Sequence, residues 1–186
     1  MGGNKMNLKG INRYQHFGFR KNWVQGFFEL KNEFWSQGNL GKYQFDGFKV
    51  WVKEAELTIN NAYSPLAAEL ERVGIFDIKT WAIILINIAY NSTIVRWYSK
   101  NVDFGVVYTS KDLLNMLGDE MSVSTRENAI TSLKETFRYS PIGNELGVGI
   151  CDISGNSVVS ITRETWQSPD PLVILYSLYK FAEKCG

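Results

Sequence analysis

Cysteine, histidine and proline are scarce in this sequence, and their scarcity argues against several classes of protein. The 186 residues include two cysteines, one histidine and four prolines. Cys151 and Cys185 have no partner at Cys-x-x-Cys spacing and no histidines at ligand spacing, which argues against a disulfide framework and a structural zinc site. The single His16 excludes histidine-based triads and multi-histidine metal sites unless it acts with distant carboxylates or a cysteine. We therefore expect a non-catalytic protein with no metal and no cofactor.

Long apolar runs and an excess of one charge are also missing. The most apolar run, residues 81–90, is too short to span a bilayer, and residues 1–10 contain no apolar signal core. Twenty lysines and arginines balance nineteen aspartates and glutamates, so the formal net charge is +1. Nucleic acid would therefore be attracted only by a local patch. These features predict a cytoplasmic protein with no membrane partner.

Helical spacing of apolar residues dominates the first half of the chain. Hydrophobic residues make up 45% of the sequence, which is enough for an ordinary globular core. Apolar side chains at steps of three and four residues predict an amphipathic helix over 20–34 and a second helix over 42–55. A short strand is expected at 57–59. Ser64-Pro65 is typical of the start of a short helix, which Gly74 ends.

The second half of the chain predicts helices and strands in alternation. The expected elements are a long buried helix over 77–98 that breaks near 91–92, a strand at 106–108, a helix at 109–117, a helix from Ser124 to before Pro141, strands of a hairpin at 148–153 and 157–162, and a helix over 169–186. Ser124 and Glu127 have the spacing of a capping box. The last helix is amphipathic, with an apolar stripe formed by Leu172, Leu175, Leu178, Tyr179 and Ala182.

Strand, helix, turn, helix and hairpin follow one another in the order of a winged helix. This order predicts one such unit over residues 77–166, and the stretch 20–74 resembles a smaller version of the same plan. The expected fold is mainly α with small β-hairpins, built from winged-helix-like units. Its expected parts are a flexible N-terminal segment at 1–13, a helical, helix-turn-helix-like unit at 14–74, and a winged-helix-like unit with a C-terminal helix at 75–186.

Candidate contacts to nucleic acid occur in both units. They are Ser124, Arg126, Asn128, Lys134, Arg138 and Arg163 in the C-terminal unit, and Lys42, Lys49 and Lys53 in a denser basic set with Arg13, Arg20 and Lys21 in the N-terminal unit. Exposed side chains on a protein-interaction domain explain the same residues, and nearby Glu127, Glu135 and Glu145 dilute any basic patch. Scattered acidic pairs such as Glu54 and Glu56 are expected on solvated faces.

Most aromatic and glycine-rich segments favour structural roles. Trp23, Trp51, Trp81 and Trp97 lie on apolar stripes and are expected in the core, whereas Trp35 and Trp166 are candidates for aromatics exposed at an interface. Cys151 is expected to pack within a strand. The glycines at 143–149 follow a helix and precede a strand, which is the reverse of a phosphate-binding loop and favours a turn.

The run Phe17-Gly18-Phe19-Arg20-Lys21-Asn22-Trp23 resembles the Phe-x-Phe-Arg-x-x-Trp opening of the bacterial domain of unknown function 4007 (DUF 4007). Segments at 40–42, 50–55, 76–81 and 168–176 resemble later parts of that family in the same order. Two departures are visible. Tyr14-Gln15-His16 replaces the family's usual His-Glu-Thr, and members generally continue beyond a point like Gly186.

This resemblance implies a bacterial protein found beside or fused to phosphoadenosine-phosphosulfate-reductase-like proteins and to DNA sulfur-modification or defence genes. It carries over no catalytic residues. We expect a DNA-binding or accessory module whose partners are double-stranded DNA and a phosphoadenosine phosphosulfate reductase-like protein. One alternative is a protein-interaction or oligomerisation domain that docks such an enzyme. Another is an accessory domain for an adenylylated or sulfated substrate, which needs a pocket with convergent arginines and lysines.

Overall fold

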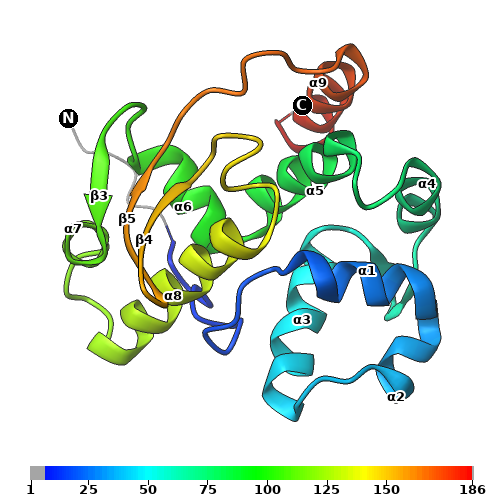
Figure 1. Cartoon of the computed structure of the whole chain (residues 1–186), viewed down its shortest axis with the longest axis horizontal. Helices are drawn as coiled ribbons and strands as arrows, with labels where there is room; N and C mark the ends of the chain where they lie inside the picture. The colour runs from blue at the N-terminus through cyan, green and yellow to red at the C-terminus, as the bar shows by residue number, and fades with distance from the viewer. Residues whose placement is uncertain (1–6, 186) are drawn as a thin grey trace.

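Residues 7–185 are described by a computed structural model, which is mainly helical with two small antiparallel sheets (Figure 1). In chain order the elements are α1 (Lys21–Leu30), the 3-10 helix η1 (Lys31–Glu33), α2 (Phe34–Gln37), α3 (Lys42–Glu54), β1 (Thr58–Ile59), β2 (Ala62–Tyr63), α4 (Pro65–Val73), α5 (Ile78–Asn91), α6 (Thr93–Asn101), β3 (Val107–Thr109), α7 (Ser110–Met116), α8 (Val123–Tyr139), β4 (Ile150–Ser154), β5 (Ser157–Thr162) and α9 (Pro171–Cys185). Strands β1 and β2 pair with each other, and the second sheet has the order β3-β5-β4. The expectation of a mainly α fold with small β-hairpins is confirmed.

Side-chain caps fix where several helices begin. Ser64, Asp77, Ser92, Thr109 and Ser122 accept backbone N–H bonds at the starts of α4, α5, α6, α7 and α8. The capping box predicted for Ser124 and Glu127 is wrong, because Ser122 caps α8 by accepting from the amide of Thr125 at 3.2 Å. Since the helix already begins at Val123, Ser124 lies within its first turn.

Helix α1 is shorter than the stripe of apolar residues predicts. The helix expected over 20–34 ends at Leu30, where Lys31 takes a φ of +53° that a right-handed helix cannot continue. The resulting turn places the ring of Phe34 at 5.9 Å from Phe27 and 5.3 Å from Phe48, measured between ring centroids. Burial of Phe34 therefore takes precedence over a continuous helix.

Ser92 divides the long apolar segment into α5 and α6. It ends α5 and caps α6 by accepting from the amide of Val95 at 3.4 Å, so the break predicted near 91–92 is confirmed. The two helices are bent by 93°. Within residues 7–185, no single helix is long and apolar enough to cross a membrane, and only this bent pair reaches the required length and composition together.

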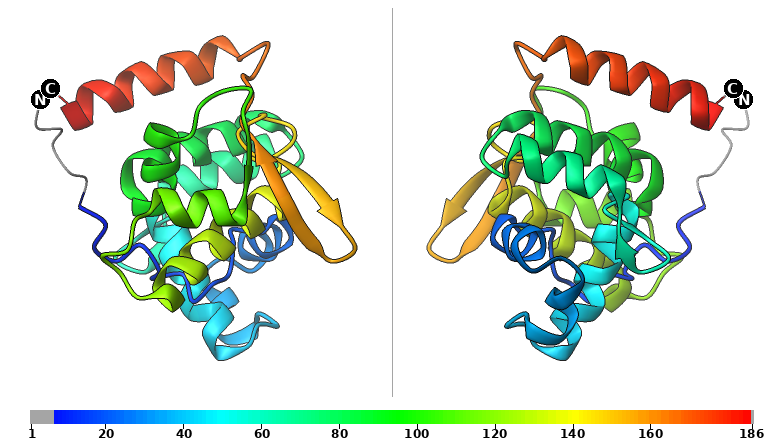
Figure 2. Two further views of the ribbon diagram at one scale, coloured as in Figure 1. Left: turned by 90° about the vertical axis from the view of Figure 1, so that its left-hand side faces the viewer. Right: turned by 90° about the vertical axis from the view of Figure 1, so that its right-hand side faces the viewer.

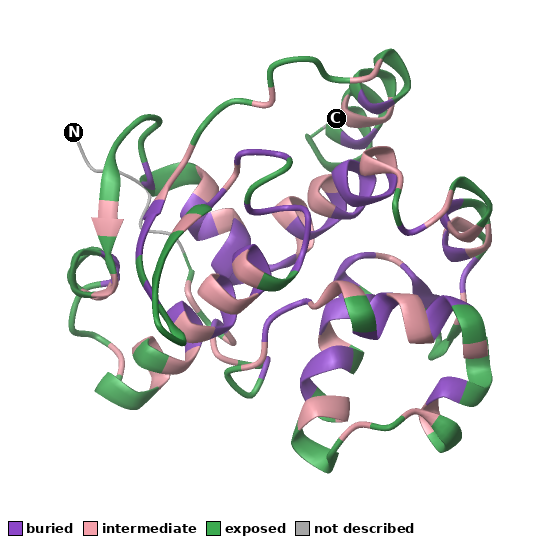
Figure 3. Cartoon of the chain, viewed as in Figure 1, coloured by how far each residue is buried: buried purple, intermediate pink, exposed green. Residues whose placement is uncertain are grey.

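An aromatic core surrounds Trp51. Its ring stacks on Tyr14 with centroids 3.9 Å apart and on Phe19 at 5.7 Å, and its Nε1–H donates to the Phe17 carbonyl at 2.8 Å. The burial predicted for Trp23, Trp51, Trp81 and Trp97 is confirmed, while Trp35 and Trp166 are half-buried. Buried apolar residues on both sides of Gly74 belong to one hydrophobic cluster (Figure 3).

The N-terminal residues contribute to this core. In the segment expected to be flexible, residues 1–6 lie outside the described range, whereas Ile11 is 1% exposed. Tyr14 is fully buried. The part of the segment around Ile11 therefore packs against the core, and an isoleucine buried in this way restrains the backbone beside it.

The Phe-x-Phe-Arg motif joins the N-terminal helices to α8. The amide of Gly18 donates to Glu135 Oε2 at 3.3 Å, and the amide of Phe19 donates to Thr136 Oγ1 at 2.8 Å. Arg20 pairs with the same Glu135 at 2.6 Å. A Cβ atom on Gly18 would lie 2.2 Å from the backbone nitrogen of Thr136, so only glycine fits there. The residues that carry the family resemblance thus form a contact between distant parts of the chain.

Two elements lie at the periphery of the molecule. Figure 2 shows that the hairpin of β4 and β5 projects from the body, and that α9 lies along one edge after a connection from β5. Helix α9 contacts α5, whereas α8 packs against both strands of the hairpin. These positions leave one side of α9 without a neighbouring element among the described residues (Figure 1).

Candidate functional site

Two arginines predicted to contact DNA bind loops of this chain. Arg126 Nη1 donates to the carbonyl of Gly118 at 2.6 Å, which holds the turn between α7 and α8. Arg163 Nη1 donates to the carbonyls of Ser99 and Val102, each at 2.9 Å, near the end of α6. Both guanidinium groups therefore satisfy backbone carbonyls of their own fold, a common structural use of arginine.

The basic residues in the second half of α8 are also engaged within the fold. Lys134 Nζ donates to Ser110 Oγ at 2.7 Å, and burial lowers the pKa of its amino group. Arg138 Nη1 donates to the carbonyl of Asn156 at 2.5 Å, in the turn of the β4–β5 hairpin. These contacts position the hairpin and α7 against α8.

The start of α8 lacks a basic surface. Ser124 is exposed and Asn128 is half-buried, as expected for residues near the helix start, but Asp119 and Glu127 are exposed beside them. Because negative side chains repel phosphate, this surface does not favour a nucleic-acid backbone. The structure does not gather the six C-terminal candidates into one basic site.

The three N-terminal candidates lie on α3, and two of them border a pocket. Lys42, Lys49 and Lys53 are all exposed. Lys49 and Lys53 line an open pocket of about 680 Å³, together with Arg13 from the segment before α1 and Arg96 from α6. We call this the basic pocket. Lys42 does not line it.

A buried carboxyl group also lines the basic pocket. Glu54 is 6% exposed, which corrects the expectation that it lies on a solvated face. Tyr14 Oη donates to its Oε2 at 2.6 Å, and Ser92 Oγ lies 2.6 Å from the same hydroxyl. Arg13 Nη1 lies 3.2 Å from Oε1, within ion-pair distance, yet Oε1 accepts no hydrogen bond from residues 7–185.

The position of Glu54 changes its acidity. Burial raises the pKa of the carboxyl group from its usual 4.5 to about 7, while the hydrogen bond from Tyr14 and the charge of Arg13 act in the opposite direction. Burial also raises the pKa of Tyr14, and the negative charge of Glu54 adds to that effect. Glu54 therefore changes its charge near neutral pH.

The raised pKa of Glu54 predicts that stability falls as the pH rises from 5 to 8. Between pH 4.5, the usual pKa of a glutamate, and about pH 7, folding takes up a proton at Glu54. The stability that this proton contributes is therefore fully present below pH 4.5 and is lost above about pH 7. At about 1.4 kcal/mol per pKa unit, the expected loss is at most roughly 3 kcal/mol. Urea denaturation at several pH values measures it. The variant Glu54→Gln should flatten the dependence, and an equally steep curve for this variant would contradict the assignment.

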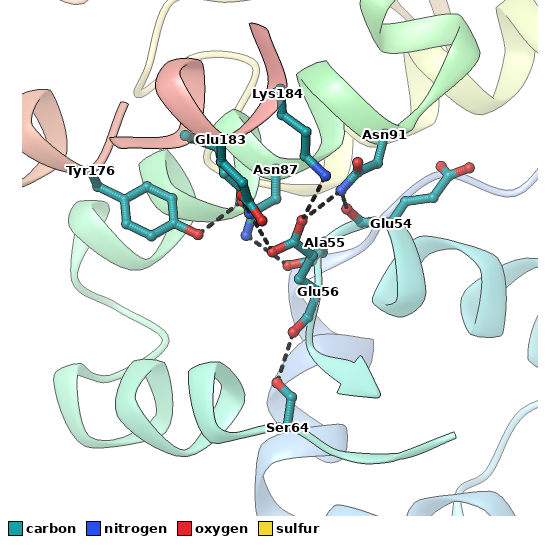
Figure 4. A network of polar contacts seen from close by, with 10 residues as sticks. Glu54, Ala55, Glu56, Ser64, Asn87, Asn91, Tyr176, Glu183 and Lys184 are labelled. Carbon is teal, nitrogen blue, oxygen red and sulfur yellow. Dashed lines mark hydrogen bonds and ion pairs between the residues drawn. The ribbon is translucent and has the colours of Figure 1, made fainter. Parts of the chain in front are cut away.

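The inner face of α9 combines buried Val173 with polar side chains, although the last helix was expected to bury an apolar stripe. Lys180 is 4% exposed, and its Nζ contacts Glu56 Oε2 at 2.6 Å and Glu183 Oε2 at 2.7 Å. Tyr176 Oη donates to Asn87 Oδ1 at 2.9 Å. Figure 4 shows this network between α9, α5 and the residues that follow α3. Polar contacts, together with buried Val173, therefore attach α9 to the body.

The predicted apolar stripe of α9 instead points outward. The exposed fractions are 56% for Leu172, 64% for Leu175, 61% for Leu178 and 65% for Tyr179, and Ala182 is also exposed. We call these five residues the α9 outer face. The helix is drawn mostly as exposed in Figure 3. An amphipathic helix usually buries its apolar stripe, so this orientation is the reverse of the usual one.

The remaining sequence candidates have structural environments. Cys151 is half-buried in β4, where burial raises the pKa of its thiol to about 11, so a nucleophilic role is not favoured. Residues 143–149 form turns, as predicted. No group of three or more histidine, cysteine, aspartate or glutamate side chains that could hold a metal ion occurs in the described part of the chain.

Comparisons with protein-family models, with curated proteins and with solved structures find no match to this chain. The resemblance of residues 17–23 to the domain of unknown function 4007 therefore stays a prediction. The fold is that of a mainly helical protein with two small antiparallel sheets, and its candidate sites are the basic pocket and the α9 outer face.

Proposed function

We propose that this chain is a non-catalytic accessory module that docks on a partner protein through the α9 outer face. The observation that carries the proposal is the exposure of Leu172, Leu175, Leu178 and Tyr179 on one side of one helix. Contiguous exposed apolar patches of this kind mark interaction sites in soluble proteins. Leucine and tyrosine side chains supply most of their energy when a partner removes them from water.

The polar inner face supports this proposal. If α9 were merely a loosely attached helix, its apolar stripe would turn inward and Lys180 would turn toward water. Lys180 instead contacts Glu56, and Tyr176 donates to Asn87, so two contacts with the body fix the orientation, whereas the contact of Lys180 with Glu183 lies within α9. Rotation of α9 about its axis would break these contacts, so they hold the α9 outer face toward solvent.

The sequence resemblance suggests which partner to test. A phosphoadenosine-phosphosulfate-reductase-like protein from the same genome is the class that the resemblance implies, and a bacterial DNA-modification or defence system is the corresponding context. We also propose that residues 75–186 contain a winged-helix-like unit followed by the C-terminal helix. The order α6, β3, α7, α8, β4, β5 and the strand order β3-β5-β4 support it.

The docking proposal predicts that the double variant Leu175→Glu and Leu178→Glu loses partner binding. Two carboxylates in an apolar interface would have to be desolvated without partners. We expect the dissociation constant for the reductase-like protein, measured by titration calorimetry, to increase at least about tenfold, because a few central side chains dominate interface energies. Both residues are more than 60% exposed, so the fold should be unaffected.

The matched control is Ile153→Glu, which places the same charge on an apolar side chain that is 46% exposed on β4. It should leave partner binding unchanged. Sedimentation velocity of the chain alone tests whether a second copy occupies the outer face, in which case the double variant should be monomeric. The proposal would be contradicted if the wild-type chain is monomeric and the double variant binds the partner as tightly as the wild type.

Binding of DNA by the C-terminal unit is less well supported. Arg126, Lys134, Arg138 and Arg163 each donate to a group of this chain, and exposed acidic side chains flank the start of α8. Their substitution is expected to alter stability before it alters DNA affinity. Contacts with double-stranded DNA are therefore expected only at the exposed lysines of α3.

A further inference from the structure

We infer that the basic pocket between α3, α6 and the segment before α1 is a binding site for a phosphate group, and that Glu54 makes its affinity depend on pH. This inference goes beyond the docking proposal and uses a different surface. It rests on the convergence of Arg13, Lys49, Lys53 and Arg96 on one pocket, and on the buried carboxyl group of Glu54 that lines the same pocket.

Four cations from three parts of the chain meet at this pocket. Lys49 and Lys53 lie one helical turn apart on α3 and therefore share a face. Arg13 Nε donates to Gly10 and Arg96 Nη1 donates to Tyr90, so both guanidinium groups are oriented by backbone carbonyls. Two planar guanidinium groups and two flexible ammonium groups suit an anion with several oxygens.

The charges of these side chains are only partly compensated within the fold. Arg13 lies within ion-pair distance of Glu54. Lys53 has no ion-pair partner among residues 7–185, and Lys49 lies over the ring of Trp35 at 5.5 Å from its centroid. A pocket with an excess of one charge concentrates ions of the opposite charge. A phosphate group carries enough negative charge and enough acceptor oxygens to engage more than one cation at once.

A buried carboxyl group lies at the wall of this pocket. The side chain of Glu54 is more than nine-tenths buried, and its Oε1 accepts no hydrogen bond in the described range but lies 3.2 Å from Arg13 Nη1, within ion-pair distance. Because Oε1 has almost no exposed surface, Glu54 acts on a bound anion through its charge and not by direct contact. When Glu54 is ionised, it repels the anion and offsets part of the charge of Arg13. When it is protonated, both effects are removed.

The groups around Glu54 determine the direction of this dependence. Tyr14 and Arg13 face it from the N-terminal segment, Ser92 from the start of α6, and Arg96 from α6 itself. Lys49 and Lys53 line the same pocket from α3. Burial raises the pKa of Glu54 to about 7, so its charge changes in the neutral range. Affinity for an anion should therefore increase as the pH falls through the neutral range.

Two sources can supply the phosphate group, a small nucleotide or a nucleic-acid backbone. The probes are adenosine 5′-monophosphate and a 12-base-pair duplex, titrated separately into the full chain at low salt by calorimetry. We expect Lys53→Ala and Arg96→Ala each to weaken binding about tenfold, because each removes a charge-assisted contact. The matched control Lys42→Ala removes an equally exposed lysine of α3 that does not line the pocket.

The control variant also distinguishes the sources. If the nucleotide binds at least as well as the duplex and Lys42→Ala has less than a twofold effect, the pocket takes a small phosphate compound. If the duplex binds more tightly and Lys42→Ala also weakens it, α3 follows a nucleic-acid backbone that enters the pocket. Both results require the losses at Lys53 and Arg96. The inference would be overturned if neither the nucleotide nor the duplex binds, or if binding is weakened by neither Lys53→Ala nor Arg96→Ala.

The contribution of Glu54 has its own measurement. Sulfate keeps a constant charge between pH 6 and 8, so its affinity reports the titration of the protein alone. We expect tighter sulfate binding at pH 6 than at pH 8, and a nearly flat profile for Glu54→Gln, whose amide stays neutral. A profile unchanged by this substitution would overturn the role of Glu54. The double variant of the α9 outer face should retain phosphate binding, so failure of docking and failure of this inference are separable.

Discussion

The variant Trp51→Ala is expected to lose about 4 kcal/mol of unfolding free energy, in the range for truncation of a fully buried tryptophan. Trp51 has no exposed surface, stacks on Tyr14 and Phe19, and donates from Nε1 to the Phe17 carbonyl. Truncation removes these ring contacts, leaves a cavity and leaves that carbonyl without its donor. Urea denaturation followed by circular dichroism measures the change.

Two further variants make this prediction specific. Tyr43→Ala removes a side chain that is 64% exposed on the same helix, and should change stability by less than about 0.5 kcal/mol. Trp51→Phe retains most of the ring volume and should give an intermediate loss, which keeps the test informative if Trp51→Ala does not fold. A loss for Trp51→Ala as small as that for Tyr43→Ala would contradict the central position of Trp51.

The variant Gly18→Val is expected to cost more than about 3 kcal/mol, above the usual range for overpacking, because rigid backbone opposes the new side chain. A Cβ atom at Gly18 would lie 2.2 Å from the amide nitrogen of Thr136 and 2.4 Å from the carbonyl carbon of Glu135. Relief of this overlap requires the N-terminal segment to separate from α8. That separation would break the hydrogen bond from Phe19 to Thr136 and weaken the ion pair of Arg20 with Glu135.

Gly41→Ala is the matched control for this substitution. Gly41 precedes α3 with a φ of −70°, and an added Cβ would meet only the side chain of Gln44, at 3.7 Å. The expected cost is below about 1 kcal/mol, which is the scale of a changed helix cap. Thermal unfolding measures both losses of stability. Equal losses for Gly18→Val and Gly41→Ala would show that Gly18 does not lie close against α8.

The local elements of this fold were largely predictable from the sequence. Ser64-Pro65, Asp77 and Thr109 begin helices as their side chains predict, and Gly74 and Gly118 take positive φ angles just after helices. Local chemistry decides such positions, because a cap or a turn involves neighbours within a few residues. The error at Lys31 arose because burial of Phe34 ends the helix early, and the error at Ser122 arose because two nearby serines are both suitable caps.

The candidate sites were less predictable, because each depends on residues far apart in the chain. The sequence identified Lys49, Lys53 and Arg13 as basic, but only the approach of α6 to α3 adds Arg96. Glu54 was interpreted as a solvated acid because nothing in its immediate neighbourhood reveals that Tyr14 covers it. Burial of a charged group is a property of the tertiary structure, and the change in its pKa follows from that burial.

The orientation of α9 illustrates the same division. The spacing of leucines predicts a helix with an apolar stripe over 169–186, because it satisfies helical periodicity in any environment, and the structure has this helix at 171–185. The sequence also predicts most of the caps, the principal core tryptophans and most of the order of helices and strands. That Lys180 and Tyr176 face the body follows from long-range packing, because Glu56 and Asn87 are there to bind them and their polar atoms need partners when buried. The apolar stripe is left facing outward for that reason.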